Sequence, residues 1–445
     1  MSDTAAGPGP THAYHGPTPA YVYDLATVRA AHDRLRSCLP APSELYYSVK
    51  ANPHPEVVAT LLGRGCRAEV SSAGELRTAL AAGVRPQDVL YTGPGKSDEE
   101  VGAALAAHVR LFSLDSAHAV RQLAAQAARH GTTAGYLLRV NPDRAATATG
   151  LTMTGLPSPF GADLDSIRHE PSEFTRHPRA VCRGLHLYLA TNLADEQALT
   201  EQFLIAVETA VRVREILGIR LETLDLGGGF AAPYAREGEL PDYPSLAGRL
   251  AAALDGAFPG WREGRPGVAF EAGRYLTATC GRLYGRVLDV KHSHGRRVMV
   301  LDTGIHHLGG MAGLKRVPPI RPQVVTDPDT APAVAADEAT MVCGPLCTPL
   351  DTWAGGAHVA AGEPGDLVHV PNVGAYGLSA SLALFLGHPL PLEVVTDGRR
   401  HLGTTRLTLH RTAITVPETT TSLKGTDDGD HVHRIAPAAP AFPAR

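Results

Sequence analysis

The chain has 445 residues, 44% of them hydrophobic, so it can bury a large core and should form two domains or one barrel with an addition. Its formal net charge of −4, with 21 histidines uncounted, argues against nucleic acid or a membrane surface as a partner. Six scattered cysteines form no disulfide framework for a chain of this length. Residues 1–18 lack the features of a signal peptide and no apolar stretch could span a bilayer, so we expect a soluble cytoplasmic protein.

Both ends of the chain are predicted to be disordered. Residues 1–18 and 418–445 are rich in Pro, Gly, Ala, Thr and Asp and have no apolar period. Two histidines in the tail, His431 and His433, are interpreted as part of a solvated loop and not as a metal site.

Between residues 43 and 278, strand-like and helical segments alternate. Strand-like runs occur at 45–49, 67–70, 89–91, 110–114, 136–140, 184–188, 221–226 and 268–271. The clearest helix spans 195–218, with Leu199, Phe203 and Val207 on one face and Gly218 as its end. This alternation predicts an α/β fold, a (β/α)8 TIM barrel, although a doubly wound open sheet fits it nearly as well.

After residue 278 the sequence changes to short β-rich runs separated by Gly and Pro. These runs lie at 283–290, 297–302, 341–343, 366–370 and 405–409, and they predict a C-terminal mostly β domain over 279–417. An early strand-like run at 21–23 precedes the first barrel strand. The segment 19–42 is therefore expected to join the β domain.

The first barrel strand ends in a lysine, Lys50. An ammonium group at the end of a buried strand must be paired or functional. Desolvation lowers the pKa of an amine, and a neutral amine can condense with a carbonyl group. The alternative is a strand-end lysine whose ammonium simply reaches solvent.

Other unusual residues follow the later strands. In a TIM barrel, functional residues collect at the C-terminal ends of the strands. The sequence places there Glu69, Ser71, Arg139, Tyr188, Thr191, the run Gly227, Gly228, Gly229, and the run Glu271, Ala272, Gly273, Arg274. Their shared placement predicts an active site at this end of the barrel.

The triglycine run suggests an anion site, because glycines let backbone N–H groups approach a phosphate. Gly227, Gly229 and Ala232 also satisfy a loose dinucleotide fingerprint. However, no second strand with a terminal acid follows about 20 residues later, as ribose binding requires. A tight turn without a ligand is the other alternative.

Glu271 and Arg274 could form a local salt bridge, or could act separately. In the second case Arg274 binds a phosphate and Glu271 faces a ring nitrogen that it keeps protonated. Tyr376 could pack in the core or reach a phosphate oxygen.

Two cysteines near a histidine pair raise the question of a metal. The spacing of Cys343, Cys347, His306 and His307 fits no common zinc pattern, so we expect no metal site. Cys343 is expected to be buried and inert, and Cys347 is the better candidate for a reactive thiol.

Together these motifs resemble the fold-type III pyridoxal-phosphate decarboxylases, the group of diaminopimelate, ornithine and arginine decarboxylases, over about residues 19–416. The resemblance implies an alanine-racemase-like TIM barrel and pyridoxal 5'-phosphate as the cofactor. Residues 47–52 match the motif Tyr-x-x-Lys-Ala-Asn, which makes Lys50 the cofactor lysine. Residues 227–229 and 271–274 match the triglycine loop and the motif Glu-Pro-Gly-Arg, with Ala272 in place of proline.

The resemblance also implies roles for single residues. Gly273, Arg274 and Tyr376 bind the phosphate, and Glu271 faces the pyridine nitrogen. Glu69 and Arg139 orient the ring and its network. Cys347, in a Gly-Pro-x-Cys motif, reaches into the partner subunit's active site, which implies a head-to-tail homodimer with shared active sites.

Two departures from the family pattern stand out. Tyr188 occupies the position of a histidine that stacks on the cofactor ring, and an aromatic face can still stack. Thr348 occupies the position of an acid that holds the distal ammonium of basic substrates, so the site should not favour lysine, ornithine or diaminopimelate. We expect Thr348 and His306 to contact the substrate.

Residues 139–143, 343–351, 374–381 and 386–389 are most similar to a narrower subgroup. Its members decarboxylate an aminoacyl group attached to an acyl carrier protein in antibiotic biosynthesis, such as a glutamyl or 3-methylaspartyl group. This similarity implies an acyl carrier protein as a partner and a substrate whose distal carboxylate is masked as a thioester.

Three alternatives stay open. The protein could decarboxylate a free amino acid of the diaminopimelate type. An amino-acid racemase shares the barrel and the lysine, but that group places arginine at the ring nitrogen, and Glu271 argues against it. A non-catalytic binding homologue tends to lose cofactor residues, whereas this chain keeps Lys50, Glu271 and Arg274.

Overall fold

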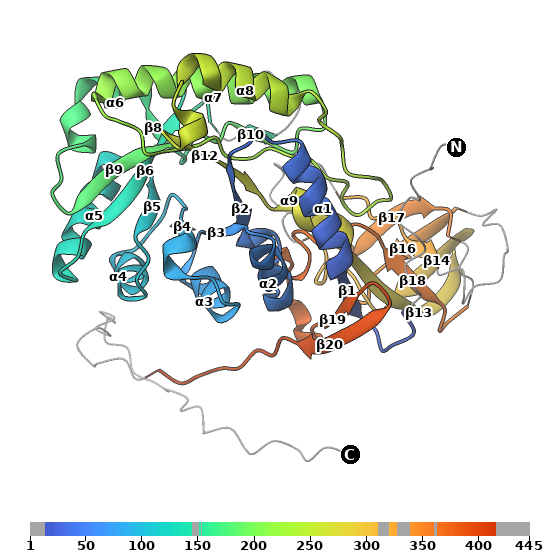
Figure 1. Ribbon diagram of the computed structural model, residues 1–445. Coiled ribbons are helices and arrows are strands. Elements are labelled where there is room, and N and C mark those ends of the chain that lie inside the picture. The colour runs from blue at the N-terminus through green and yellow to red at the C-terminus, as the bar shows by residue number, and fades with distance from the viewer. Residues whose placement is uncertain are drawn as a thin grey trace. The chain divides into compact units, whose positions relative to one another are not determined.

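A computed structural model of the chain describes residues 14–144, 151–152, 154–309, 320–326, 339–359 and 363–414 (Figure 1). Apart from residues 14–18, the segments predicted to be disordered lie outside the described residues, as do His431 and His433. Residues 408–414 form neither helix nor strand. In the part of the chain that is described, no helix has the length and apolarity needed to cross a membrane.

Within the described residues, eight parallel strands close into a barrel. In barrel order they are β2 (Glu44–Ser48), β3 (Arg67–Val70), β4 (Val89–Tyr91), β5 (Leu111–Leu114), β6 (Ala134–Asn141), β9 (Ala180–His186), β11 (Thr223–Asp225) and β12 (Gly267–Ala272). The last strand returns to the first, with Glu271 in register with Tyr46. The predicted TIM barrel is therefore confirmed, and the open sheet is wrong.

Helices connect the barrel strands and lie outside them (Figure 1). They are α2 (Pro55–Gly63), α3 (Ala73–Ala81), α4 (Asp98–Ala106), α5 (Ala117–Arg129), α6 (Leu164–His169), α7 (Glu196–Leu217) and α8 (Leu246–Ala257). The helix predicted at 195–218 is α7: the Asp195 side chain caps its N-terminus, and Gly218, with φ +62°, ends it in the left-handed region. Its predicted apolar face is buried against the barrel.

Short elements complete this part of the chain. Two-residue strands are β7 (Leu151–Thr152), β8 (Ala162–Asp163) and β10 (Ala190–Thr191), and two further helices are α1 (Leu25–Ser37) before the barrel and the single turn α9 (Arg274–Thr277) after it. Single 3-10 turns lie at Val49–Ala51, Pro86–Asp88, Pro171–Phe174, Trp261–Glu263, Ala278–Cys280, Leu378–Ala380 and Phe385–Gly387.

The barrel interior changes from apolar to polar toward the C-terminal ends of its strands. A buried cluster of Tyr46, Leu90, Leu137 and Ala269 fills the middle. Alternate residues of a strand face the same side, so the residues two positions further along also point inward. These are Ser48, Thr92, Arg139 and Glu271, all buried. Four polar side chains thus lie next to the apolar cluster, at the C-terminal ends of the strands, where TIM barrels have their active sites.

A second sheet follows the barrel. Its order is β17 (Thr352–Ala357), β16 (Thr340–Cys343), β14 (Arg296–Leu301), β13 (Gly281–Ser293), β1 (Ala20–Asp24), β19 (Leu392–Asp397) and β20 (Arg400–Arg406), while β18 (Leu367–Val370) pairs with β13 and with β15 (Val325–Thr326). The early strand β1 lies between β13 and β19, and the assignment of the whole segment 19–42 to the β domain stays a prediction. The run predicted at 405–409 is misplaced, because β20 ends at Arg406. The domain boundary near residue 278 stays a prediction.

Candidate active site

Lys50 lies in the 3-10 turn that follows β2. The Tyr47 hydroxyl donates to the Asn52 carbonyl at 2.7 Å and closes this turn. Val49 and Ala51 are buried, whereas 45% of the Lys50 side chain is exposed. The turn therefore anchors its flanking residues and presents the amine to a cleft.

The Lys50 ammonium pairs with Glu69 at the end of β3, with Nζ 3.2 Å from Oε2. Desolvation acts to lower the pKa of Lys50, but the negative charge of Glu69 and further contributions from Tyr376 and Glu271 outweigh it, so the pKa is raised. Our expectation of a lowered pKa was wrong. It considered burial alone, and Glu69 stands 19 residues away in sequence.

Glu69 is itself buried among hydroxyl groups. It accepts hydrogen bonds from the Ser71 hydroxyl at 3.0 Å and from the Thr92 hydroxyl. Burial acts to raise the pKa of Glu69, yet Lys50 and the hydroxyl donors hold it below its ordinary value. The carboxylate is therefore ionised and keeps the amine in place.

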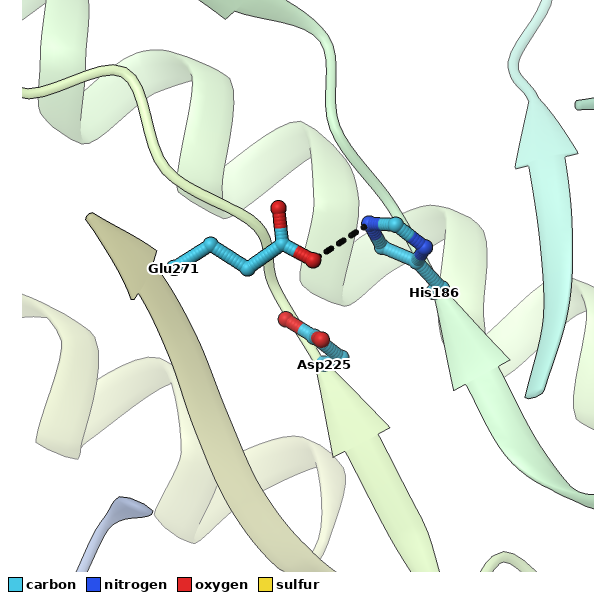
Figure 2. Close-up of side chains that lie close together, drawn as sticks. All are labelled: His186, Asp225 and Glu271. Carbon is cyan, nitrogen blue, oxygen red and sulfur yellow. Dashed lines mark ion pairs between the residues drawn. The ribbon is translucent and has the colours of Figure 1, made fainter. Parts of the chain in front are cut away.

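Glu271, Asp225 and His186 meet at the ends of β12, β11 and β9 (Figure 2). His186 Nε2 lies 3.3 Å from Glu271 Oε1, and the three residues are almost fully buried. Burial, together with Asp225 and Glu69, raises the pKa of Glu271 well above its ordinary value. The result is a carboxyl that is protonated more readily than an exposed glutamate.

The triglycine run lies between these acids and Tyr188. Asp225 Oδ1 accepts the Gly227 N–H at 2.8 Å, and Gly227 has φ +70°. A Cβ on Gly228 would lie 2.4 Å from the Glu271 carbonyl oxygen and 3.1 Å from the Tyr188 ring. A side chain at this position has no room, so the loop offers bare backbone to the site.

Arg274 and Tyr376 lie together near Lys50. The Arg274 guanidinium carbon is 4.8 Å from the Tyr376 ring centroid, and its buried Nε has no hydrogen-bond partner among the described residues. The Tyr376 N–H donates to the Ala51 carbonyl at 2.7 Å, which fixes this loop of the second domain on the lysine turn. A Cβ on Gly273 would lie 2.8 Å from Ala51 Cβ.

The alternative of a local Glu271–Arg274 salt bridge is not supported, since no such ion pair occurs within the described residues. Glu271 points to His186, and Arg274 lies on Tyr376. The two charged groups therefore have different neighbours, and their separate roles stay a prediction.

Tyr188 follows β9 and lies beside Arg139, whose guanidinium carbon is 5.8 Å from the Tyr188 ring centroid and 4.6 Å from that of Phe160. Burial raises the pKa of Tyr188 to about 12, and a hydrogen bond from Thr191 acts in the opposite direction. Its hydroxyl therefore stays protonated at neutral pH. Arg139 is buried, and its Nε lacks a partner among the described residues.

Lys50 and Tyr376 line a cleft of about 750 Å³. Its other walls come from α3, with Glu75 and Arg77, and from the segment that contains Ser379. The cleft leads from the surface to the lysine amine, so a long substrate can approach along it.

The remaining predicted residues lie outside this group. Cys347 is exposed and Thr348 accepts the Leu350 N–H, both in the loop between β16 and β17. His306 is buried with its ring 3.6 Å from that of His307, and burial lowers the pKa of His306 to about 4. Among the described residues, none of the three makes a hydrogen bond or ion pair with Lys50. Cys343 is half-buried and not buried as predicted, because it forms the last pair of β16 with β17, opposite Thr352.

The sequence and the fold of this chain are similar to those of known proteins. A family model for the pyridoxal-binding domain of pyridoxal-dependent decarboxylases matches residues 25–278. L-glutamyl-[BtrI acyl-carrier protein] decarboxylase of Niallia circulans is 31% identical over 393 residues, covering 85% of this chain and 88% of the relative. The chain belongs to the pyridoxal-dependent decarboxylases.

Other relatives of this decarboxylase act on diaminopimelate. Diaminopimelate decarboxylase of Neisseria meningitidis serogroup A is 31% identical over 393 residues, covering 86% of this chain and 91% of the relative. The crystal structure of diaminopimelate decarboxylase from Helicobacter pylori complexed with L-lysine has a TM-score of 0.74 at 24% identity, covering 86% of this chain and 92% of that one. That likeness supports the fold.

The residues of this decarboxylase fit pyridoxal phosphate. An amine beside a carboxylate, a carboxyl with a raised pKa, and a glycine loop near a buried arginine suit the aldehyde, the ring nitrogen and the phosphate, respectively. Four buried polar atoms lack hydrogen-bond partners among the described residues and lie in or next to this group, namely Arg139 Nε, Asp225 Oδ2, Glu271 Oε1 and Arg274 Nε.

Four buried residues of the decarboxylase site were missed in the sequence: Thr92, Ser113, His186 and Asp225. Asp225 carried a signal, because it stands two residues before the triglycine run at the end of an apolar strand. Ser113 and His186 are ordinary residues of barrel strands and Thr92 directly follows β4, so only the closure of the barrel brings the three together.

Proposed function

We propose that the decarboxylase holds pyridoxal phosphate through the residues predicted from its sequence. Lys50 would hold the aldehyde, Glu271 would meet the ring nitrogen, and the Tyr188 ring would pack against the cofactor ring. The phosphate is held by Gly227, Gly228, Gly229, Gly273, Arg274 and Tyr376, and Glu69, Arg139 and Thr191 keep Lys50 and Tyr188 in place. The pairs Lys50–Glu69 and Arg274–Tyr376 support this assignment.

We further propose that the substrate is an acidic-type aminoacyl group, glutamyl-like or 3-methylaspartyl-like, carried on an acyl carrier protein in antibiotic biosynthesis. The observation that carries this proposal is the lack of an available acid in the loop after Cys347. Thr348 has no charge, and the carboxylate of the next acid, Asp351, is buried and accepts the N–H groups of Ile305 and Leu346, both at 2.9 Å. Neither residue can bind a distal ammonium.

The carrier-linked substrate agrees with the cleft and with one relative. A cleft of about 750 Å³ that opens beside α3 gives room for the flexible arm of a carrier. The relative from Niallia circulans is a glutamyl-carrier decarboxylase by name. A thioester removes the distal negative charge of the acyl group, so no cation of this site is needed to neutralise it.

In the proposed reaction the residues of the chain bind, orient and move protons. Pyridoxal phosphate, when bound, withdraws electrons from the α-carbon so that its bond to the carboxylate can break. Glu69 positions the Lys50 amine. The substrate amine then binds where the Lys50 amine was held. Lys50 or Cys347 then returns a proton to the α-carbon.

Turnover on matched substrates tests the proposal. The protein is incubated with glutamyl-loaded carrier, free glutamate, diaminopimelate or lysine, and the products are weighed by mass spectrometry. We expect loss of CO₂ from the loaded carrier alone, and none in Lys50→Ala, whereas Lys291→Ala, which changes an exposed lysine of β13, keeps full activity. Faster turnover of a free amino acid contradicts the carrier assignment.

A second candidate is a free amino-acid decarboxylase of the diaminopimelate type. The Neisseria meningitidis relative favours it, because it is 31% identical to this chain as well. The same substrates separate the two. In addition, Thr348→Glu should increase turnover of lysine or diaminopimelate under the first proposal, because it restores a free acid in the loop.

We also propose a homodimer in which Cys347 completes the partner's site. The exposure of Cys347 supports this role. Mixing Lys50→Ala with Cys347→Ala, each inactive alone, should restore about a quarter of the activity, because half of the dimers are mixed and each has one intact site. A mixture as inactive as its components contradicts the shared site.

A further inference from the structure

A buried acid and histidine cluster lies at the base of the site, and the proposed function uses only one of its members. One oxygen or nitrogen atom from each of Glu271, Asp225 and His186 lies within 4.8 Å of the others (Figure 2). All three side chains point toward one another from the ends of neighbouring strands and are shielded from water. Two carboxyl groups at this distance in a buried site cannot both ionise cheaply.

Ser113 and Glu271 lie beside the two ring nitrogens of His186. The Ser113 hydroxyl lies 2.7 Å from Nδ1, and Nε2 faces Glu271 Oε1 at 3.3 Å. Burial and the positive charges of Arg139, Lys50 and Lys96 lower the pKa of His186 well below its ordinary value, so the ring is neutral. When the hydroxyl donates to Nδ1, the ring proton is on Nε2 and points to the Glu271 carboxyl.

Asp225 is held in place by the triglycine loop. Its Oδ1 accepts the Gly227 N–H, and its carboxyl group lies beside that of Glu271, with which it interacts directly. Burial raises the pKa of Asp225 to about 7, the Gly227 N–H opposes this, and Glu69 raises it further. Glu271 thus faces the acids Asp225 and Glu69, the cations Lys50 and Arg139, and the neutral His186.

We propose that Asp225 is a positioning residue that keeps a proton on the Glu271 carboxyl, while Ser113 and His186 hold that carboxyl in place. This inference rests on the proposed assignment of Glu271 to the ring nitrogen. A carboxyl that retains its proton at neutral pH can transfer it to the ring nitrogen. The carboxyl then becomes a carboxylate and the nitrogen gains one positive charge, so the site changes by no net charge. An ordinary glutamate has already lost this proton to water.

Infrared titration of the full chain without cofactor measures the proton directly. The protonated-carboxyl band is followed against pH in the wild type, Asp225→Asn, Glu271→Gln and Asp255→Asn. Asp255 is an exposed acid of α8 that pairs with Arg262 at 2.9 Å, so Asp255→Asn is the matched control. We expect the band in the wild type and in the control at pH 7, and a midpoint lower by at least about one pH unit in Asp225→Asn, because the like charge is gone.

A second readout uses the cofactor-loaded protein and does not depend on the substrate. The visible absorbance of the bound cofactor is titrated with alkali, and its midpoint should fall in Asp225→Asn and in Ser113→Ala, but not in Asp255→Asn. If Asp225→Asn does not fold, as judged by circular dichroism, Ser113→Ala decides alone. Because neither titration uses a carrier or an amino acid, a failure here is distinct from a failure of the substrate proposal.

Two results overturn the proposal. The first is that Asp225→Asn has the same midpoint as the wild type in both titrations. If Asp225→Asn does not fold, the same result in Ser113→Ala overturns the proposal. The other is a stoichiometric divalent metal ion in the purified wild type that is absent from Asp225→Asn and Glu271→Gln, because a metal bound by His186, Asp225 and Glu271 would then take the place of the proton.

Discussion

Replacing Gly228 by alanine should weaken cofactor binding without changing the fold. A Cβ at this position would lie 2.4 Å from the Glu271 carbonyl oxygen and 3.1 Å from a Tyr188 ring carbon. Cβ contacts below 3.0 Å essentially do not occur, and the carbonyl belongs to β12, which is fixed by its neighbours. The loop must therefore move away from the strand.

The size of the effect follows from overpacking, which costs about 1–3 kcal/mol in a well-packed site. The loop of the cofactor-free protein can relax by moving, but it must return to bind the phosphate, so most of this cost appears on binding. We expect the affinity for pyridoxal phosphate to fall by about tenfold to a hundredfold, since 1.4 kcal/mol corresponds to about a factor of ten.

Gly248→Ala is the matched control. Gly248 lies inside α8, and a Cβ there meets nothing within 4 Å. The substitution should leave cofactor affinity unchanged and should stabilise the protein by up to about 1 kcal/mol, because alanine favours a helix. Absorbance titration with pyridoxal phosphate gives the affinity, and denaturant unfolding gives the stability. If Gly228→Ala and the wild type bind pyridoxal phosphate with equal affinity, the close approach of Gly228 to the Glu271 carbonyl is refuted.

Three further predictions concern the acids and the lysine. Glu69→Gln should lower the pKa of Lys50, because Glu69 is the largest of the contributions that raise this pKa against desolvation; the amine is then neutral at lower pH, so uptake of pyridoxal phosphate should accelerate near neutral pH, as followed by absorbance. Lys50→Ala should abolish the cofactor absorbance that borohydride fixes, and retained covalent cofactor argues against this lysine. Asp351→Ala should destabilise the protein by about 2–6 kcal/mol in denaturant unfolding, because the N–H groups of Ile305 and Leu346 lose their acceptor; a change below about 1 kcal/mol contradicts this.

The barrel and the position of Lys50 could be predicted from local patterns. Each barrel strand is an apolar run of a few residues, and α7 carries its own signals, Asp195 as N-cap and Gly218 as C-cap. Chain order then placed Lys50, Glu69, Arg139 and Glu271 at the same ends of the strands. The family motifs extended this to the cofactor.

The electrostatics of the site could not be predicted in this way. The raised pKa of Lys50 depends on Glu69 in the next strand, and that of Glu271 on Asp225, which is 46 positions earlier and adjacent only through the barrel. The two-residue period of a strand shows which residues share a face with His186, but it does not show whether that face points into the barrel. The closure of the barrel decides the direction. The conformation of the loop that contains Cys347 likewise depends on the hydrogen bond that Asp351 accepts from the N–H of Ile305, which is distant in sequence.

The position of β1 has a consequence for synthesis of the protein. This strand leaves the ribosome before both of its neighbours in the sheet, β13 and β19, so its second neighbour is missing until Leu392–Asp397 have emerged. The hydrogen bond from the Tyr376 N–H to the Ala51 carbonyl also cannot form before Tyr376 has emerged. A nascent chain can thus close its barrel before the β domain is complete, yet the lysine turn gains its contact with Tyr376 only after that residue has emerged. Shortened chains should therefore lack a competent site.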